Sequence, residues 1–189
     1  DQPRSRGLGD VYKRQTFLRD KYGFRSDFME KNTLKGTIDG VKIDCITHSY
    51  DYLEKPYTES GIRLYSMEDI IAMKLSAIAD NGSRLKDFID IAFLSTRFPF
   101  GSMLRLYERK FPGSNVIRPF KAITYFDDID FEEDIVMLNC KFDWKLIERR
   151  LVDMTKIQNK VFESFPLPLK EQEPRSVVKK GIHKRGLKR

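Results

Sequence analysis

The sequence predicts an α+β fold in which a small β-sheet precedes a bundle of helices. Apolar and polar residues alternate near Asp39-Gly40, a dipeptide typical of a hairpin turn, and this pattern predicts the sheet. After Ser66, apolar residues recur every three or four positions in segments separated by proline and glycine, and this pattern predicts the helices. Because strands and helices occupy successive stretches, the fold is α+β rather than alternating α/β.

The composition is that of an ordinary folded domain. The 189 residues are 40% hydrophobic and 33% charged, which suits one compact core with appendages. No apolar run is long enough to span a bilayer and no signal-peptide pattern occurs at the start, so we expect a cytoplasmic protein with no membrane partner. Two cysteines and two histidines are too few for a disulfide framework or a zinc knuckle.

The positive charge is confined to the two ends of the chain. The net charge is +7, but residues 1–15 carry +2 and residues 166–189 carry +6, which leaves −1 for residues 16–165. A basic isoelectric point therefore says little about the folded region, which lacks a strong basic patch for nucleic acid. Residues 166–189 hold almost no apolar side chains after Leu169, and we expect them to form a disordered basic tail.

The first residues have an unusual sequence. Residues 10–15, Asp-Val-Tyr-Lys-Arg-Gln, resemble a translated sequencing-library adapter. We therefore expect residues 1–15 to be a non-native leader and the native protein to extend upstream of Thr16. A flexible native tail is the alternative.

Residues 16–62 are predicted to hold the sheet. A helix is expected to end at Gly23, and strands to lie near residues 24–48, with Phe24–Ile38 as one strand with polar interruptions. Past the hairpin turn, Asp44 alternates with apolar neighbours and points to the opposite face. Aspartate is uncommon inside strands, and both an exposed edge and a metal site would explain it.

Residues 63–165 are predicted to form the helical domain, which opens with a capped helix. Ser66 is expected to cap a helix that starts at Met67, with Glu68 and Asp69 in the first turn where the helix dipole favours negative charge. Asn81-Gly82 is expected to end this helix.

Lys74 lies inside the apolar stripe of this first helix. A lysine drawn into apolar surroundings requires an acidic partner or a phosphate. A second helix from Ser83 carries Asp87 and Asp90 on one face, where their like charges repel unless a cation lies nearby. We therefore predict that Lys74 contacts Asp87 or Asp90. The simpler alternative is a helical hairpin with an extended Lys74 and a solvated charged turn.

Three further helices complete the prediction. Ser102 is expected to cap the first of them, Asn115 or Pro119 to open the next, which runs through Phe126, and Asp143 to cap a last helix that runs to about Phe165. The acidic run at residues 127–134 is read as a solvated loop, because its carboxylates show no metal-ligand spacing.

The order of these charged residues resembles a known family. Lys74, followed by Arg84, Lys86-Asp87 and Asp90, is similar to the lysine and the (R/K)DxxD motif of the AbiEii/AbiGii nucleotidyltransferase toxin family. Residues 31–44 resemble the strand that carries the family's third active-site carboxylate. Residues 125–128 with Asp143-Trp144 resemble its C-terminal helical part, so the resemblance covers residues 16–155.

The resemblance implies an active site and a reaction. It implies catalytic roles for Asp44, Lys74, Asp87 and Asp90, with Asp44 as a metal ligand, and substrate binding by Arg84 and Lys86. The sheet would be the remnant of a nucleotidyltransferase sheet. The reaction would transfer a nucleotide from a nucleoside triphosphate to an acceptor, tRNA or another nucleic acid, within a bacterial abortive-infection or toxin–antitoxin system that includes a cognate antitoxin.

The family's first motif has no match in this chain. That motif is a Gly-Gly-Ser/Thr loop followed by an Asp-x-Asp pair, and no Gly-Gly dipeptide occurs in the sequence. We therefore expect Mg²⁺ or Mn²⁺ to bind only in the full-length protein, and the chain as written to be inactive. If Asp44 and Lys74 share one site, they must lie on the same side of the molecule.

Two other functions fit the same residues. One is a small-molecule nucleotidyltransferase of the antibiotic-modifying type, which would not need a basic surface for RNA. The other is a catalytically inactive protein-binding module, in which the charged hairpin has only a structural role.

Overall fold

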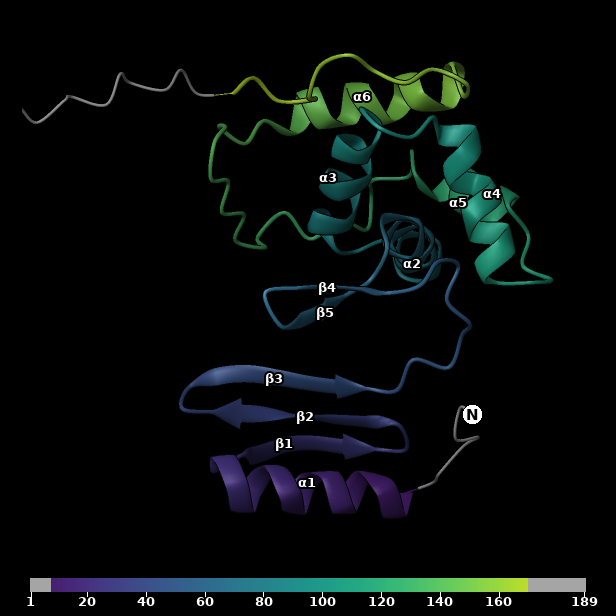
Figure 1. The fold of residues 1–189 in the computed structure, drawn as a ribbon. Coiled ribbons are helices and arrows are strands. Elements are labelled where there is room, and N and C mark those ends of the chain that lie inside the picture. Colours follow the sequence, from purple (N-terminus) through teal and green to yellow (C-terminus); the bar gives the residue numbers. More distant parts are fainter. Residues whose placement is uncertain (1–7, 170–189) are drawn as a thin grey trace, which may run out of the picture. The chain divides into compact units, whose positions relative to one another are not determined.

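The computed structural model describes residues 8–169 and divides the chain into two compact units, one up to Asp51 and one from Tyr52. The first unit contains one helix and a three-stranded sheet, and the second contains a short hairpin and five helices (Figure 1). The elements are α1 (Leu8–Tyr22), β1 (Arg25–Glu30), β2 (Thr33–Ile38), β3 (Val41–Ile46), β4 (Tyr57–Glu59), β5 (Ile62–Leu64), α2 (Met67–Asp80), α3 (Leu85–Leu94), α4 (Phe100–Lys110), α5 (Ile117–Ala122) and α6 (Trp144–Lys156).

The first unit is an antiparallel sheet of order β1-β2-β3. Asp39 and Gly40 both have positive φ, 48° and 80°, which confirms the predicted hairpin turn between β2 and β3. The prediction of one strand over residues 24–38 was wrong, because this stretch forms the two strands β1 and β2. The chain turns at Lys31-Asn32, where Asn32 adopts a φ of 69° that asparagine tolerates better than most residues.

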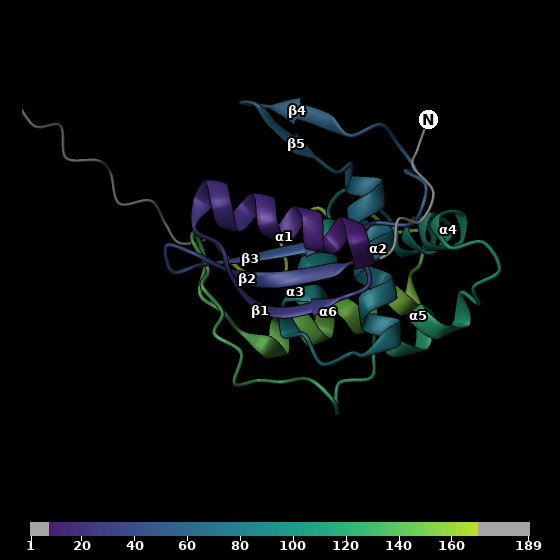
Figure 2. The same cartoon turned by 90° about the horizontal axis from the view of Figure 1, so that it is seen from below.

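The helix α1 runs along one face of this sheet (Figure 2). Val11, Phe24 and Leu34 are buried between them, and Ile43 and Cys45 pack against the same cluster. Asp44 lies between these two residues on β3 and therefore points to the other face, as the alternation predicted.

A close approach in the sheet explains Gly36 on β2. A Cβ atom at this position would clash with the carbonyl oxygen of Arg25 and lie 2.5 Å from Cζ of Phe24. We expect Gly36→Ala to destabilise the first unit by about 2–3 kcal/mol, because both neighbours must shift. Hydrogen exchange of the sheet amides measures this. Gly101→Ala, whose Cβ would meet nothing closer than 3.4 Å, is the control, and equal exchange in both variants would contradict the account.

The second unit is organised around α2. The helices α3, α4 and α5 pack on α2, and α6 packs on α3 (Figure 1). Among the fully buried side chains of its core are Ile71, Leu75, Phe88, Met103 and Ile147. The fold is thus α+β, with an antiparallel sheet followed by helices, as predicted.

The boundaries of α4, α5 and α6 differ from the prediction. The helix α4 begins at Phe100 rather than after Ser102, with Pro99 at its N-cap. The helix α5 begins at Ile117, between the two predicted starts, and ends at Ala122 rather than at Phe126. The helix α6 ends at Lys156 and not near Phe165. Beyond it, Phe162 and Leu167 are buried, and the backbone N–H of Phe162 donates to the carbonyl of Ser95. Burial of these two side chains in the core therefore competes with continuation of the helix.

The unit boundary also differs from the predicted one at residues 62–63. The strands β4 and β5 belong to the same unit as the helices. The backbone N–H groups of Leu53 and Glu54, which precede β4, donate to the side chain of Asp69 on α2. The first helix includes residues 8–15, which belong to the predicted leader. The predicted tail from residue 170 onward lies outside the described residues. No helix in residues 8–169 is long and apolar enough to cross a membrane.

Candidate active site

The α2–α3 hairpin forms as its sequence predicts. The hydroxyl of Ser66 accepts a hydrogen bond from the backbone N–H of Asp69 at 3.0 Å, so Ser66 caps α2. At the other end Gly82 has a φ of 66°, and its N–H donates to the carbonyl of Ala77. These two ends fix the length of α2 and lead the chain directly into α3.

The hairpin brings together the three charged residues at the centre of the predicted site. Nζ of Lys74 lies 2.6 Å from Oδ1 of Asp87 and 2.7 Å from Oδ2 of Asp90. This confirms the predicted contact of Lys74 with either aspartate. The side chain of Asp87 is 3% exposed and that of Asp90 is 48% exposed, so the cluster has one buried and one accessible carboxylate.

Lys74 is held in its charged form. Its burial alone would lower its pKa, but the hydrogen bonds and charges of Asp87 and Asp90 outweigh burial and raise the pKa above its usual value. An ammonium group has three N–H donors. Two of them point to Asp87 and Asp90, and the third takes part in no hydrogen bond among the described residues. The site therefore presents a fixed positive charge with a spare donor.

Arg84 and Lys86 lie at the start of α3, the helix that carries Asp87 and Asp90. The helix α3 begins at Leu85, two residues later than the predicted start at Ser83, and Arg84 occupies its N-cap. Nε of Arg84 lies 3.9 Å from Oδ2 of Asp87, and its side chain is largely exposed. Nζ of Lys86 lies 2.9 Å from Oε1 of Glu133. Four of the five predicted site residues of the second unit, Lys74, Arg84, Asp87 and Asp90, are thus joined by ion pairs, and Lys86 pairs with Glu133 instead.

The acidic run at residues 127–134, which was predicted to be a solvated loop, makes specific contacts with the start of α3. The backbone N–H of Asp130 donates to the carbonyl of Ser83, and Asp130 forms an isolated parallel bridge with Arg84. Glu133 forms the ion pair with Lys86. Nothing in the spacing of these carboxylates predicted the contacts, because they depend on how the loop folds back over α3.

Asp44 is the predicted site residue of the first unit. It is exposed, and Nζ of Lys35 on the neighbouring strand lies 3.9 Å from its Oδ2. In the described part of the chain, no three His, Cys, Asp or Glu side chains lie close enough to hold a metal ion. Asp44 offers a single carboxylate, so these residues do not by themselves fit a two-metal site. Whether Asp44 and Lys74 lie on the same side stays a prediction.

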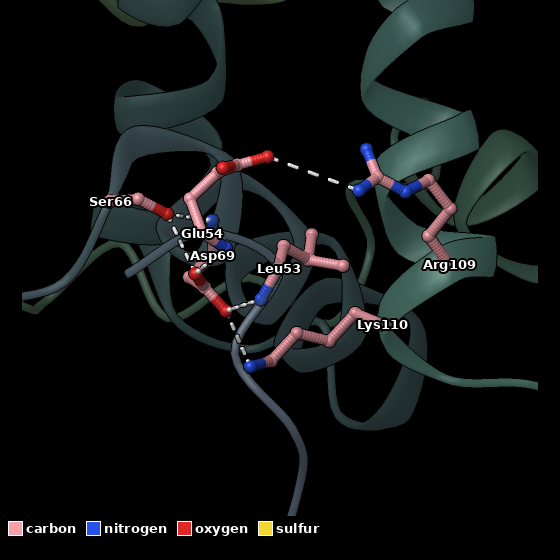
Figure 3. A network of polar contacts seen from close by, with 6 residues as sticks. All are labelled: Leu53, Glu54, Ser66, Asp69, Arg109 and Lys110. Carbon is pink, nitrogen blue, oxygen red and sulfur yellow. Dashed lines mark hydrogen bonds and ion pairs between the residues drawn. The ribbon is translucent and has the colours of Figure 1, made fainter. Parts of the chain in front are cut away.

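A second ion pair lies deeper in the helical unit, between Asp69 on α2 and Lys110 on α4 (Figure 3). Nζ of Lys110 lies 2.6 Å from Oδ1 of Asp69, and both side chains are fully buried. Asp69 also accepts hydrogen bonds from the hydroxyl of Ser66 and from the backbone N–H groups of Leu53 and Glu54. This network joins α2, α4 and the segment that opens the second unit.

The network gives Asp69 a strong preference for its ionised form. Burial alone would raise its pKa, but the hydrogen bonds from Lys110, Ser66 and two backbone N–H groups lower it from 3.8 to about 2. The resulting stabilisation is present above the unfolded-state pKa and is lost as pH falls from about 4 to about 2.

The acid stability of the second unit tests this assignment. Ionisation of Asp69 is expected to contribute about 2 kcal/mol to the free energy of unfolding above pH 4 and nothing below pH 2. Urea unfolding of the protein and of Asp69→Asn between pH 5 and pH 2 measures the difference. The stability difference between the two should shrink on acidification, and a constant difference would contradict the assignment.

Comparison with known proteins identifies the family of the chain. A family model described as "Nucleotidyl transferase AbiEii toxin, Type IV TA system" matches residues 23–166, which include the hairpin and Asp44. An uncharacterized protein of Aquifex aeolicus (strain VF5) is 32% identical over 114 residues, which is 57% of this chain and 55% of that protein. The chain thus spans about half the length of this curated relative. No solved structure shows significant similarity to the present chain. The chain belongs to the AbiEii family of nucleotidyl transferase toxins of type IV toxin–antitoxin systems.

Proposed function

We propose that the protein is a cytoplasmic toxin that transfers a nucleotide from a nucleoside triphosphate to tRNA, in a system that includes a cognate antitoxin. Family membership supports the class of reaction. The observation that carries the proposal is Lys74, a charged lysine fixed between two carboxylates with one donor to spare. Compact lysine ammonium groups commonly bind phosphates as point charges.

In this proposal each residue of the cluster has its own role. Lys74 donates a hydrogen bond to the phosphates of the nucleotide and stabilises the negative charge that develops on them during transfer. Asp87 is buried and holds the ammonium in place. Asp90 is half-exposed and can exchange its contact with Lys74 for one with the substrate. Arg84 and Lys86 lie at the start of the same helix with accessible side chains and would contact the nucleotide or the acceptor.

Nucleotidyl transfer in this family implies Mg²⁺ or Mn²⁺. Such an ion would neutralise phosphate charge and help the acceptor hydroxyl to attack. In this chain, Asp44 is the residue proposed to bind it, and a single exposed carboxylate does not complete such a site. We therefore propose that the 189-residue chain alone does not transfer nucleotides, and that the full gene product supplies the remaining carboxylates.

The transfer assay distinguishes this function from its alternatives. The full gene product is incubated with Mg²⁺, with each α-³²P-labelled nucleoside triphosphate in turn, and with total tRNA or with an aminoglycoside antibiotic. Labelled tRNA supports the proposal. A labelled antibiotic and unlabelled tRNA would favour the small-molecule enzyme, whereas no labelled product with any nucleotide would favour the protein-binding module. The 189-residue chain is assayed in parallel.

A further inference from the structure

Glu133 differs from the other carboxylates of the acidic run in how it is placed. Its Oε1 accepts a hydrogen bond from Nζ of Lys86 at 2.9 Å. Its Oε2 is buried and has no hydrogen-bond partner among the described residues. A buried carboxylate oxygen without a donor costs stability, so Glu133 is held in place by its contact with Lys86 and not by this oxygen. Its hydrogen bond with Lys86 outweighs desolvation and lowers the pKa of the Glu133 carboxyl, which keeps it charged.

The loop holds Glu133 in position through contacts on both sides. The N–H of Asp130 donates to the carbonyl of Ser83 at 2.9 Å. The ring of Phe131 lies edge-on to Trp144 at 5.2 Å between centroids, and Ile129 is buried in the core. The acidic loop therefore contacts the α2–α3 turn and α6, and Glu133 of this loop pairs with Lys86.

Lys86 has a second possible partner on its own helix. Asp90 lies four residues further along α3, so the two side chains are neighbours on the helix surface. Asp90 instead pairs with Lys74, and Lys86 pairs with Glu133. Three cations are thus paired with three carboxylates: Lys74 with Asp87 and Asp90, Arg84 with Asp87, and Lys86 with Glu133. The partner of Lys86 therefore determines whether Asp90 is shared between two ammonium groups.

From this geometry we infer that Glu133 is a positioning residue of the site: it draws Lys86 away from Asp90, so that Asp90 remains the partner of Lys74. Without Glu133, Lys86 forms an ion pair with Asp90. The ion pair between Asp90 and Lys74 is then weaker. The importance of this arrangement for nucleotide binding rests on the proposed function, but the arrangement itself can be tested without transfer activity.

The first test measures the amine reactivity of Lys74 in the 189-residue chain by limited acylation and mass spectrometry. Glu133→Gln is expected to speed acylation of Lys74 about threefold, because an ammonium that loses a carboxylate partner releases its proton more easily. Asp134→Asn removes the same charge from the neighbouring residue and is expected to leave Lys74 unchanged. The double variant Glu133→Gln/Lys86→Gln, which lacks the competing amine, is expected to restore the original rate.

Two results would overturn the inference. Unchanged Lys74 reactivity in Glu133→Gln would show that Lys86 does not compete for Asp90. Faster acylation that persists in the double variant would show a general loosening of the loop instead, a purely structural role.

A second test links the inference to the reaction. In the full gene product, Glu133→Gln is expected to raise KM for the nucleotide about fivefold with little change in kcat, since it disturbs binding more than chemistry. If charge alone mattered, removal of a carboxylate would lower KM for an anionic nucleotide in both Glu133→Gln and Asp134→Asn, and that result would also overturn the inference. Absence of transfer in every variant would count against the proposed function, while the acylation result would still decide the role of Glu133.

Discussion

Replacement of Lys110 by methionine is expected to lower the free energy of unfolding of the helical unit by about 3–5 kcal/mol. Methionine has a similar length, so packing is nearly retained, but Asp69 is left as a buried charge without its cation. The hydrogen bonds that Asp69 accepts from Ser66, Leu53 and Glu54 compensate only in part. Urea unfolding followed by the fluorescence of Trp144, the single tryptophan, measures the loss.

The adjacent residue on α4 supplies a matched control. Arg109 pairs with Glu54 at 4.0 Å and is more than half exposed, so Arg109→Met is expected to cost less than about 1 kcal/mol (Figure 3). The double variant Asp69→Leu/Lys110→Met should be more stable than the sum of the two single losses predicts, because it leaves no unpaired charge. Equal costs for Lys110→Met and Arg109→Met would contradict a central role for the buried pair.

Replacement of Lys74 by methionine is expected to reduce kcat/KM for nucleotide transfer by the full gene product at least about 100-fold, the effect of removing one fixed donor from a developing negative charge. The variant also leaves Asp87 buried without its closest cation, so part of the loss reflects stability. Unfolding is therefore measured in parallel, and rates are compared below the melting temperature of the variant.

Two comparisons separate catalysis from folding. Lys156→Met removes an exposed lysine of α6 and is expected to leave transfer unchanged. Asp87→Asn breaks the same ion pair from the other side but leaves Lys74 paired with Asp90. It should therefore lower stability and yet retain more activity than Lys74→Met, because Lys74 and its charge remain. Equal activity in Lys74→Met and Lys156→Met would remove Lys74 from the mechanism.

The sequence predicted those parts of the site that depend on local rules. The ends of α2 follow from a serine cap and a glycine stop, which act within one turn of the chain. The contact of Lys74 with Asp87 and Asp90 follows from the cost of burying a lysine and from the like charges on α3. Both arguments need only helical geometry and short connections.

The features that the sequence did not predict depend on contacts distant in the chain. Asp69 was read as a first-turn residue that favours the helix dipole, but its main partner is Lys110, 41 residues away. Glu133 was one of several carboxylates in an acidic run, and only the folding of the loop over α3 brings it to Lys86. The end of α6 likewise depends on burial of Phe162. Composition and periodicity carry no information on such pairings.

The most direct test of the account is whether a nucleotide covers Lys74. Acylation of Lys74 in the full gene product is measured with and without the nucleoside triphosphate that supports transfer, with Lys156 as the internal reference. At a nucleotide concentration of about ten times Kd, acylation of Lys74 is expected to slow about tenfold while that of Lys156 is unchanged. If the nucleotide is transferred but Lys74 reacts equally fast in its presence, the phosphates bind elsewhere and the proposed site is wrong.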